Sequence, residues 1–262
     1  MTIGYSLKSS FASTKFIKTF LKKLKLVFVL IQKHFKLNSI QVMIAALNEE
    51  PGIGPTIAEL IDKLGNQRIL LIDGNSYDKT VEVAKNSGAE ILYQNGKGKG
   101  SAIFQGLKHV GFQTEYIVLI DADYTYPAKY IPLMVDILNK KSEVGMVCGN
   151  RFNPLVDKRV FRGPFYFGNK FLSLAHNFVN GIVLHDPLTG LRVIRAELLK
   201  GWMLNSEGFD IEVELNYLVK RKGFSIFEIP IEYRPRIGEK KLKIKDGLVI
   251  LKRIFKEIII SE

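Results

Sequence analysis

An apolar run that ends in two aspartates constrains the fold of this chain more than any other feature. Residues 116–120 are all apolar or aromatic, and Asp121 and Asp123 follow, separated by one alanine. A short run of this kind is typical of a strand buried on both faces. Burying unpaired carboxylates is costly, so we expect the aspartates at the carboxyl end of the strand, where open α/β sheets bind ligands. The pair suits a hard divalent cation that also binds a diphosphate, and it equally suits a strand end capped by an Asx-turn.

From residue 40 onward, the pattern alternates between strands and helices. Strands are predicted at 40–46, 67–73, 90–94, 116–120, 144–149 and 225–233. Helices are predicted at 54–64, 78–86, 100–110, 128–140, 167–179, 209–220 and 245–260. This alternation predicts an α/β fold in which helices flank a mostly parallel sheet with right-handed crossovers. We assign it to one domain, residues 39–262, that ends in an amphipathic helix.

Residues 1–38 form a separate, basic segment. They carry lysines and no acidic residue, in a chain whose net charge is +12. Residues 15–37 fit an amphipathic helix with a lysine face and a phenylalanine and leucine face, which is typical of a helix lying in a membrane interface. The alternative is that the apolar face packs on the rest of the protein. A polybasic end favours an anionic membrane over nucleic acid, so we expect a cytoplasmic protein, peripheral on the inner face of a membrane.

Cysteine and histidine content bears on disulfide formation and on zinc binding. The single cysteine, Cys148, cannot form an internal disulfide, fits a reducing compartment, and follows an apolar run that predicts a buried strand. With one cysteine and four scattered histidines, a zinc site is not expected.

Acidic groups follow three of the predicted strands. Glu49, Asp73 and the Asp121–Asp123 pair are expected at the same edge of the sheet. The loop 95–101 contains glycines and two lysines and leads into a helix, which favours a phosphate ligand. It matches neither the Walker A pattern nor Gly-x-Gly-x-x-Gly, and alone it also fits a solvated loop.

The order of these motifs gives the pattern its specificity. The segments 42–50, 71–80, 98–100 and 121–123 resemble the GT-A glycosyltransferases of family 2, whose fold is Rossmann-like. The segments 148–152, 186–192, 208–212 and 236–242 resemble the dolichyl-phosphate mannose and glucose synthase branch of that family. The resemblance covers residues 40–245.

The resemblance implies roles for individual residues. The nucleotide sugar is expected to contact Ala45, Leu47, Glu49, Asp73, Lys99, Asp121, Ala122 and Asp123, with Glu49 and Asp73 at the ribose and base. Asp121 and Asp123 are expected to bind Mg²⁺ or Mn²⁺. The acceptor phosphate is assigned to Arg151, Arg162 and Lys241, and the catalytic residues are Asp123, Arg151 and Arg236. Asp186 and Arg192 are expected to form a structural polar pair.

This sequence departs from the family pattern in ways that bear on the donor. The first strand ends in Ala45-Ala46-Leu47-Asn48-Glu49, without the usual aromatic residue, and Asp73 is followed by Gly74 where a second acid is usual. Thr125 replaces a glutamine that often ligates the metal in mannose synthases. The donor is therefore left as a UDP- or GDP-hexose, carrying glucose or mannose.

These expectations together describe a metal-dependent, inverting hexosyl transfer to a polyprenyl phosphate. A phosphate monoester with a second pKa of about 6 is largely a dianion at neutral pH and needs no general base. A family 2 enzyme with a hydroxyl acceptor would need one, for which Asp210 is the candidate. More distant alternatives are a sugar nucleotidyltransferase, which normally has a glycine-rich loop after its first strand, and a basic protein that binds membranes or nucleic acid without catalysis.

Overall fold

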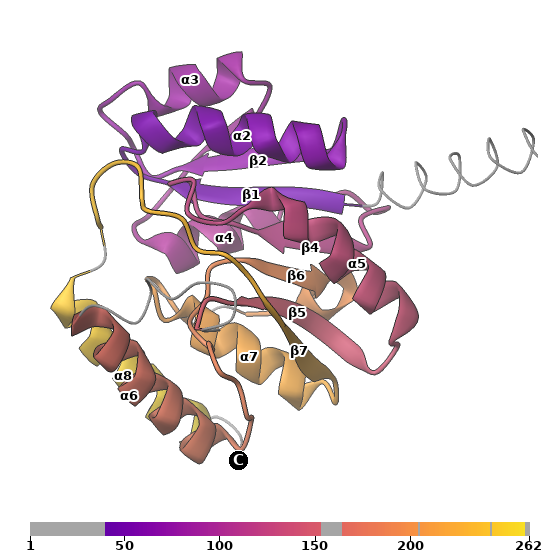
Figure 1. The fold of residues 1–262 in the computed structure, drawn as a ribbon, viewed down its shortest axis with the longest axis vertical. Helices are drawn as coiled ribbons and strands as arrows, with labels where there is room; N and C mark the ends of the chain where they lie inside the picture. The colour runs from indigo at the N-terminus through magenta and orange to yellow at the C-terminus, as the bar shows by residue number, and fades with distance from the viewer. Residues whose placement is uncertain (1–39, 153–163, 204, 242, 260–262) are drawn as a thin grey trace, which may run out of the picture. The chain divides into compact units, whose positions relative to one another are not determined.

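A computed structural model describes residues 40–152, 164–203, 205–241 and 243–259 (Figure 1). Within these ranges the chain forms a seven-stranded sheet in the order β3-β2-β1-β4-β6-β5-β7. The strands are β1 (Ile40–Ala46), β2 (Arg68–Asp73), β3 (Glu90–Tyr93), β4 (Tyr116–Leu119), β5 (Val144–Asn150), β6 (Arg192–Arg195) and β7 (Ser225–Pro230). The helix predicted at 15–37 and the predicted site residue Arg162 lie outside the described residues.

The sheet is parallel except at β6, which runs antiparallel to both β4 and β5. The prediction of a mostly parallel sheet is therefore confirmed, but β6 was missed. Its four residues begin and end in arginine, so they give no apolar run, although Arg192 is only 1% exposed. This short strand lies between β4 and β5 in the sheet, and the alternation of strands and helices in the sequence does not predict it.

Helices cover both faces of the sheet. They are α2 (Glu50–Leu64), α3 (Thr80–Asn86), α4 (Lys99–Leu107), α5 (Ile131–Lys140), α6 (Pro164–Asn180), α7 (Ile211–Arg221) and α8 (Ile244–Ile259). The helix predicted from residue 54 begins earlier, at Glu50, with Pro51 in its first turn. A proline is tolerated there because the first amide groups of a helix have no partner within the helix.

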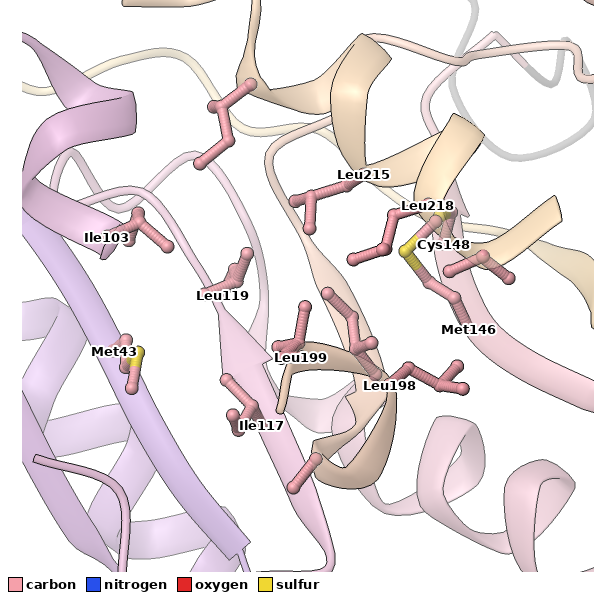
Figure 2. Close-up of a cluster of buried hydrophobic side chains, with 14 of the residues drawn as sticks. Met43, Ile103, Ile117, Leu119, Met146, Cys148, Leu198, Leu199, Leu215 and Leu218 are labelled. Carbon is pink, nitrogen blue, oxygen red and sulfur yellow. The ribbon is translucent and has the colours of Figure 1, made fainter. Parts of the chain in front are cut away.

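The larger core lies between the sheet and the two helices α4 and α7, which cover one face of it (Figure 2). Met43, Ile117 and Leu119 come from the middle strands, and Leu215 and Leu218 come from α7. Cys148 is buried in this cluster, as predicted from its position in an apolar strand. Each fully buried aliphatic side chain contributes about 1.5–3 kcal/mol, so this core fixes α4 and α7 against the strands whose ends form the site.

Helices α6 and α8 lie side by side, away from the sheet (Figure 1). A smaller cluster, which includes Leu172 of α6 and Ile250 and Ile254 of α8, packs them against Val213 and Tyr217 of α7. In the described part of the chain, none of the helices has the length and apolarity that crossing a bilayer requires.

The strand order places ligand-binding chemistry at one edge. From β1 the chain passes to β2 and β3 on one side, and then to β4 on the other side of β1. This reversal leaves a crevice at the carboxyl ends of β1 and β4, which is where open α/β sheets bind ligands.

Candidate active site

Asp123 lies just beyond β4 and is 3% exposed. Its Oδ1 accepts hydrogen bonds from the Thr125 amide at 3.1 Å and the Thr125 hydroxyl at 2.6 Å. The Asx-turn, which the sequence allowed as an alternative role for the pair, is therefore present at Asp123. Oδ2 accepts a 2.6 Å hydrogen bond from Nη1 of Arg236, whose other terminal nitrogen pairs with Glu49. Arg236 therefore joins the carboxylates that follow β1 and β4.

Asp121 is held by a second cation. Lys99, at the start of α4, donates to Asp121 Oδ1 at 2.6 Å and to Glu212 Oε1 at 2.8 Å. Glu212 lies in the first turn of α7, and its side chain is 7% exposed. The role of Glu212 was not predicted from the sequence. The available signal was its position two residues after Asp210, in the 208–212 motif and in the acidic first turn of a helix.

The environment shifts the pKa values of the two aspartates in opposite directions. Burial raises the pKa of Asp123, and the charge of Asp121 raises it further. Burial also opposes ionisation of Asp121, but Lys99 outweighs it and lowers the pKa of that carboxyl. Burial would lower the pKa of the Lys99 ammonium, and the two carboxylates beside it instead raise that pKa above its usual range. Lys99 and Asp121 are therefore both charged at neutral pH.

The arrangement fits a divalent cation. Lys99 forms direct ion pairs with Asp121 and Glu212, and Arg236 forms them with Glu49 and Asp123. The two cations therefore cannot neutralise all four carboxylates. Asp121 Oδ2 lies beside Gly190, where a Cβ would come within 2.5 Å of it. Among the described residues no group of three or more candidate ligands occurs. Two carboxylates completed by diphosphate oxygens and water are the usual Mg²⁺ arrangement with a nucleotide.

Two cavities meet at these ion pairs. The larger, about 570 Å³, lies at the ends of β1 and β2, and the smaller, about 300 Å³, lies toward α6 and α8. Both are lined by Lys99, Asp121, Asp123, Phe209 and Arg236. A group bound at the aspartates would therefore contact the contents of both cavities.

The larger cavity collects most of the predicted nucleotide-binding residues. Its lining includes Ala45, Leu47, Glu49, Lys99, Ala122 and four further lysines, Lys97, Lys241, Lys243 and Lys245. Asp73 is buried instead, and its Oδ2 accepts hydrogen bonds from the amides of Asn75 and Ser76, so it shapes the loop after β2. A contact between Asp73 and the ribose or base stays a prediction.

Lys241 and Arg151 line different cavities. Lys241 was assigned to the acceptor phosphate together with Arg151, but it lines the larger cavity and not the smaller one. After Arg236 the chain passes over Glu49, where a Cβ on Gly238 would lie 3.6 Å from Glu49 Oε2. This course carries Lys241 to the lining of the larger cavity.

Arg151 lines the smaller cavity and is held by Asp186. Its Nε and Nη2 each donate a 2.7 Å hydrogen bond to one oxygen of Asp186, and its amide donates to the same carboxylate at 3.0 Å. The predicted pair of Asp186 and Arg192 is therefore wrong. Arg192 instead donates to Asn216 Oδ1 at 2.6 Å and to backbone carbonyls, because β6 points its side chain into the core.

The smaller cavity is lined by both charged and apolar side chains. Arg151, Arg236 and Lys240 contribute cations beside the aspartates, and most of the other lining residues are aromatic or aliphatic: Tyr126, Phe152, Tyr166, Leu188, Phe209, Tyr233 and Ile250. The Tyr126 hydroxyl accepts a 2.7 Å hydrogen bond from the Gly190 amide, so it fixes the loop that packs on Asp121. This lining suits a molecule with an anionic head and an apolar body.

Comparison with known proteins identifies the family. The model of glycosyl transferase family 2 matches residues 41–202. The chain belongs to glycosyltransferase family 2. This family 2 glycosyltransferase is 31% identical to the dolichyl-phosphate hexose transferase of Haloferax volcanii, over 79% of this chain and 88% of that protein. It is 28% identical to the dolichol-phosphate mannosyltransferase of Pyrococcus furiosus, over 83% of this chain and 63% of that protein.

Solved structures confirm the fold of this glycosyltransferase. Glucosyl-3-phosphoglycerate synthase from Mycobacterium tuberculosis, in complex with UDP, superposes with a TM-score of 0.66 at 22% identity, over 84% of this chain and 80% of that one. The same synthase with Mn²⁺, UDP-glucose and phosphoglyceric acid gives a TM-score of 0.64 at 21% identity, over 84% and 79%. At this identity the likeness concerns the GT-A type of fold alone.

Proposed function

We propose that this glycosyltransferase moves a hexose from a UDP- or GDP-hexose to a polyprenyl phosphate at a membrane surface, with inversion at the sugar carbon. The observation that carries this proposal is the pair of cavities that meet at Asp121 and Asp123. One is lined by lysines at the sheet's ligand-binding edge, and the other joins arginines to an apolar wall. The dolichyl-phosphate transferases among its relatives support the same acceptor class.

The donor occupies the larger cavity in this proposal. The lining of this cavity includes glycines, which let the backbone approach a ligand closely, and five lysines. These features suit a nucleoside diphosphate, because the lysines offset its negative charge. Asp121 and Asp123 would hold Mg²⁺ or Mn²⁺ there, and the ion supplies electrostatic stabilisation of the departing diphosphate. Relatives of the same fold have been solved with UDP and these metals.

The acceptor phosphate binds at the cations of the smaller cavity in this proposal. Asp186 accepts hydrogen bonds from two nitrogens of the Arg151 guanidinium. The remaining N–H groups of Arg151 are available to phosphate oxygens. The ion pair fixes the orientation of the planar fork, so less rotational freedom is lost when phosphate binds. The apolar wall formed by Phe152, Tyr166 and Ile250 then accommodates the first part of the prenyl chain.

The reaction needs no proton acceptor on the enzyme. An oxygen of the acceptor dianion forms a bond to the anomeric carbon while the bond from that carbon to the diphosphate breaks, and the electron pair leaves with the diphosphate. Lys99 and Arg236 lie where this negative charge develops and stabilise it. The histidines that the structure describes, His109, His176 and His185, line neither cavity.

The alternative of a hydroxyl acceptor is less well supported. Its candidate base, Asp210, lines neither cavity, and its Oδ2 accepts a 2.9 Å hydrogen bond from Arg253 Nε. A carboxylate that lies outside both cavities and is held by an arginine is not positioned to take a proton from an acceptor hydroxyl.

One assay tests the proposal. The protein is incubated with Mn²⁺, labelled UDP- or GDP-hexoses and a short-chain polyprenyl phosphate, and the expected product is an organic-extractable hexosyl phosphate. Asp123→Ala should abolish transfer, whereas Asp136→Ala, on the outer side of α5, should not. Thermal shift with each donor, with and without Mn²⁺, identifies the nucleotide, because a ligand of the folded state raises Tm. Transfer to a polyprenol but not to its phosphate, lost in Asp210→Asn, would contradict the proposal.

A further inference from the structure

Helix α6 exposes a continuous apolar stripe. Phe167, Phe171, Leu174 and Phe178 are 70%, 61%, 70% and 89% exposed. Their spacing of four, three and four residues places them on one line along the helix, about 16 Å long at 1.5 Å per residue. A single exposed apolar side chain is ordinary, but three phenylalanines and a leucine on one helix line mark an interaction surface.

The neighbouring helix also exposes apolar side chains, together with lysines. On α8, which packs beside α6, Leu248, Val249 and Phe255 are 69%, 49% and 52% exposed. Lys252 and Lys256 are exposed on the same helix. Helix α6 contains no acidic residue, and the acid nearest the end of α8, Glu257, is buried against Arg221. We call the exposed apolar residues of α6 and α8, with these lysines, the α6–α8 face.

Aromatic rings connect the face to the smaller cavity. The ring of Tyr166 lies 5.5 Å from that of Phe152, which lines the cavity, and 5.5 Å from that of Phe167, the first residue of the stripe. Lys170 Nζ lies 5.0 Å from the centre of the Phe152 ring. The apolar wall of the cavity is thus continuous with the exposed stripe, and a cation lies at the junction.

We propose that the α6–α8 face inserts into the interface of an anionic lipid bilayer and holds the smaller cavity at the membrane surface. Apolar side chains flanked by lysines are the chemistry that binds such a bilayer. A second copy of the chain fits less well, because pairing two such faces would bring their lysines together. Exposure and charge alone support the surface, and only its purpose, access to a membrane-embedded acceptor, rests on the proposed function.

The first test measures insertion at a single site in the full chain. Cys148 is buried and is the chain's single cysteine, so a fluorophore can be attached selectively to Phe178→Cys. With vesicles of phosphatidylcholine and phosphatidylglycerol, NBD at position 178 should shift to the blue and lose its quenching by iodide. The matched control is Phe112→Cys, a fully exposed phenylalanine elsewhere, whose probe should not change. Vesicle binding that leaves the probe at position 178 in water would overturn the proposal.

The second test removes the stripe. Phe171→Ser, Leu174→Ser and Phe178→Ser combined should weaken vesicle binding at least about a hundredfold, because each apolar side chain loses its favourable transfer from water. Phe112→Ser should leave binding unchanged, and an unchanged Tm checks that the triple variant folds. Unchanged vesicle binding would overturn the proposal, as would a protein-concentration-dependent blue shift without lipid, which would assign the face to a second copy.

The two proposals fail separately. Transfer to a short-chain, soluble polyprenyl phosphate without vesicles should be the same in the triple variant and the wild type, because none of the three residues lines a cavity. Absence of that transfer in the wild type would contradict the proposed function and leave the docking result standing.

Discussion

Lys99 Nζ donates a 2.8 Å hydrogen bond to Glu212 Oε1, across 113 residues of sequence. The same nitrogen contacts Asp121, so one largely buried ammonium joins the start of α4, the end of β4 and the first turn of α7. Three elements that are remote in sequence thus depend on one charge for their alignment at the site.

Removal of that charge should destabilise the fold. Lys99→Met leaves Asp121 and Glu212 without their cation, and breaking a buried pair costs about 3–5 kcal/mol. We expect a loss near the lower figure, because Asp121 retains 31% of its side-chain exposure. Urea unfolding measures it, with Lys97→Met in the exposed part of the same loop as control. Additive effects in the Lys99→Met and Glu212→Gln cycle would contradict the contact.

Gly190→Ala should impair metal binding without unfolding the protein. The new Cβ would lie 2.5 Å from Asp121 Oδ2, so the carboxylate must turn away from its position. Calorimetry with Mn²⁺ and the nucleoside diphosphate should show at least about a tenfold loss of affinity, a change of about 1.4 kcal/mol. Gly168→Ala, in α6 where nothing lies within 4 Å, is the matched control. Equal metal affinity in the two variants would contradict the assignment of Asp121.

Arg151→Lys should affect the acceptor and spare the donor. Lysine keeps the charge but cannot pair with Asp186 through a fork while also donating to phosphate. Charge-assisted hydrogen bonds contribute about 1.5–3 kcal/mol, so the KM for the polyprenyl phosphate should rise about tenfold or more. Donor affinity, measured by calorimetry, should not change. Arg195→Lys, whose guanidinium donates to backbone carbonyls away from the cavities, controls for loss of an arginine fork.

Stability should depend on pH through Glu49. Burial raises the pKa of this carboxyl and the charge of Asp123 adds to the rise, while Arg236 opposes it, so the pKa reaches about 7 from an ordinary 4.5. A raised pKa means that the neutral form stabilises the folded state fully below pH 4.5, and that this stabilisation is lost as the pH rises through 7.

Glu49→Gln stays neutral throughout this range. The Tm of Glu49→Gln, minus that of the wild type, should therefore increase between pH 4.5 and 7.5, as measured by scanning calorimetry. Glu50→Gln, at the adjoining position, serves as the control. A difference that stays constant with pH would mean that Glu49 is not buried as described.

Sequence patterns located the parts of the site but not their partners. The apolar run before Asp121, the acids after β1 and β2, and the lysine loop before α4 all pointed to one edge of a parallel sheet, and the fold brings them there. The pairing of Arg151 with Asp186 was missed because the sequence offered Arg192 as an equally suitable partner. The two arginines can be told apart only in the tertiary structure, because the antiparallel β6 directs Arg192 into the core.

By itself, the sequence determined the α/β alternation, the family and the edge of the sheet at which the candidate site lies. These follow from local properties: apolar runs, their period, and charged residues that cannot stay inside a strand. Tertiary structure decided which cation neutralises which carboxylate, the position of Lys241 at the larger cavity and the exposure of the α6 stripe. Such outcomes depend on contacts between remote segments, because an amphipathic helix has the same pattern whether its apolar face is covered or left open.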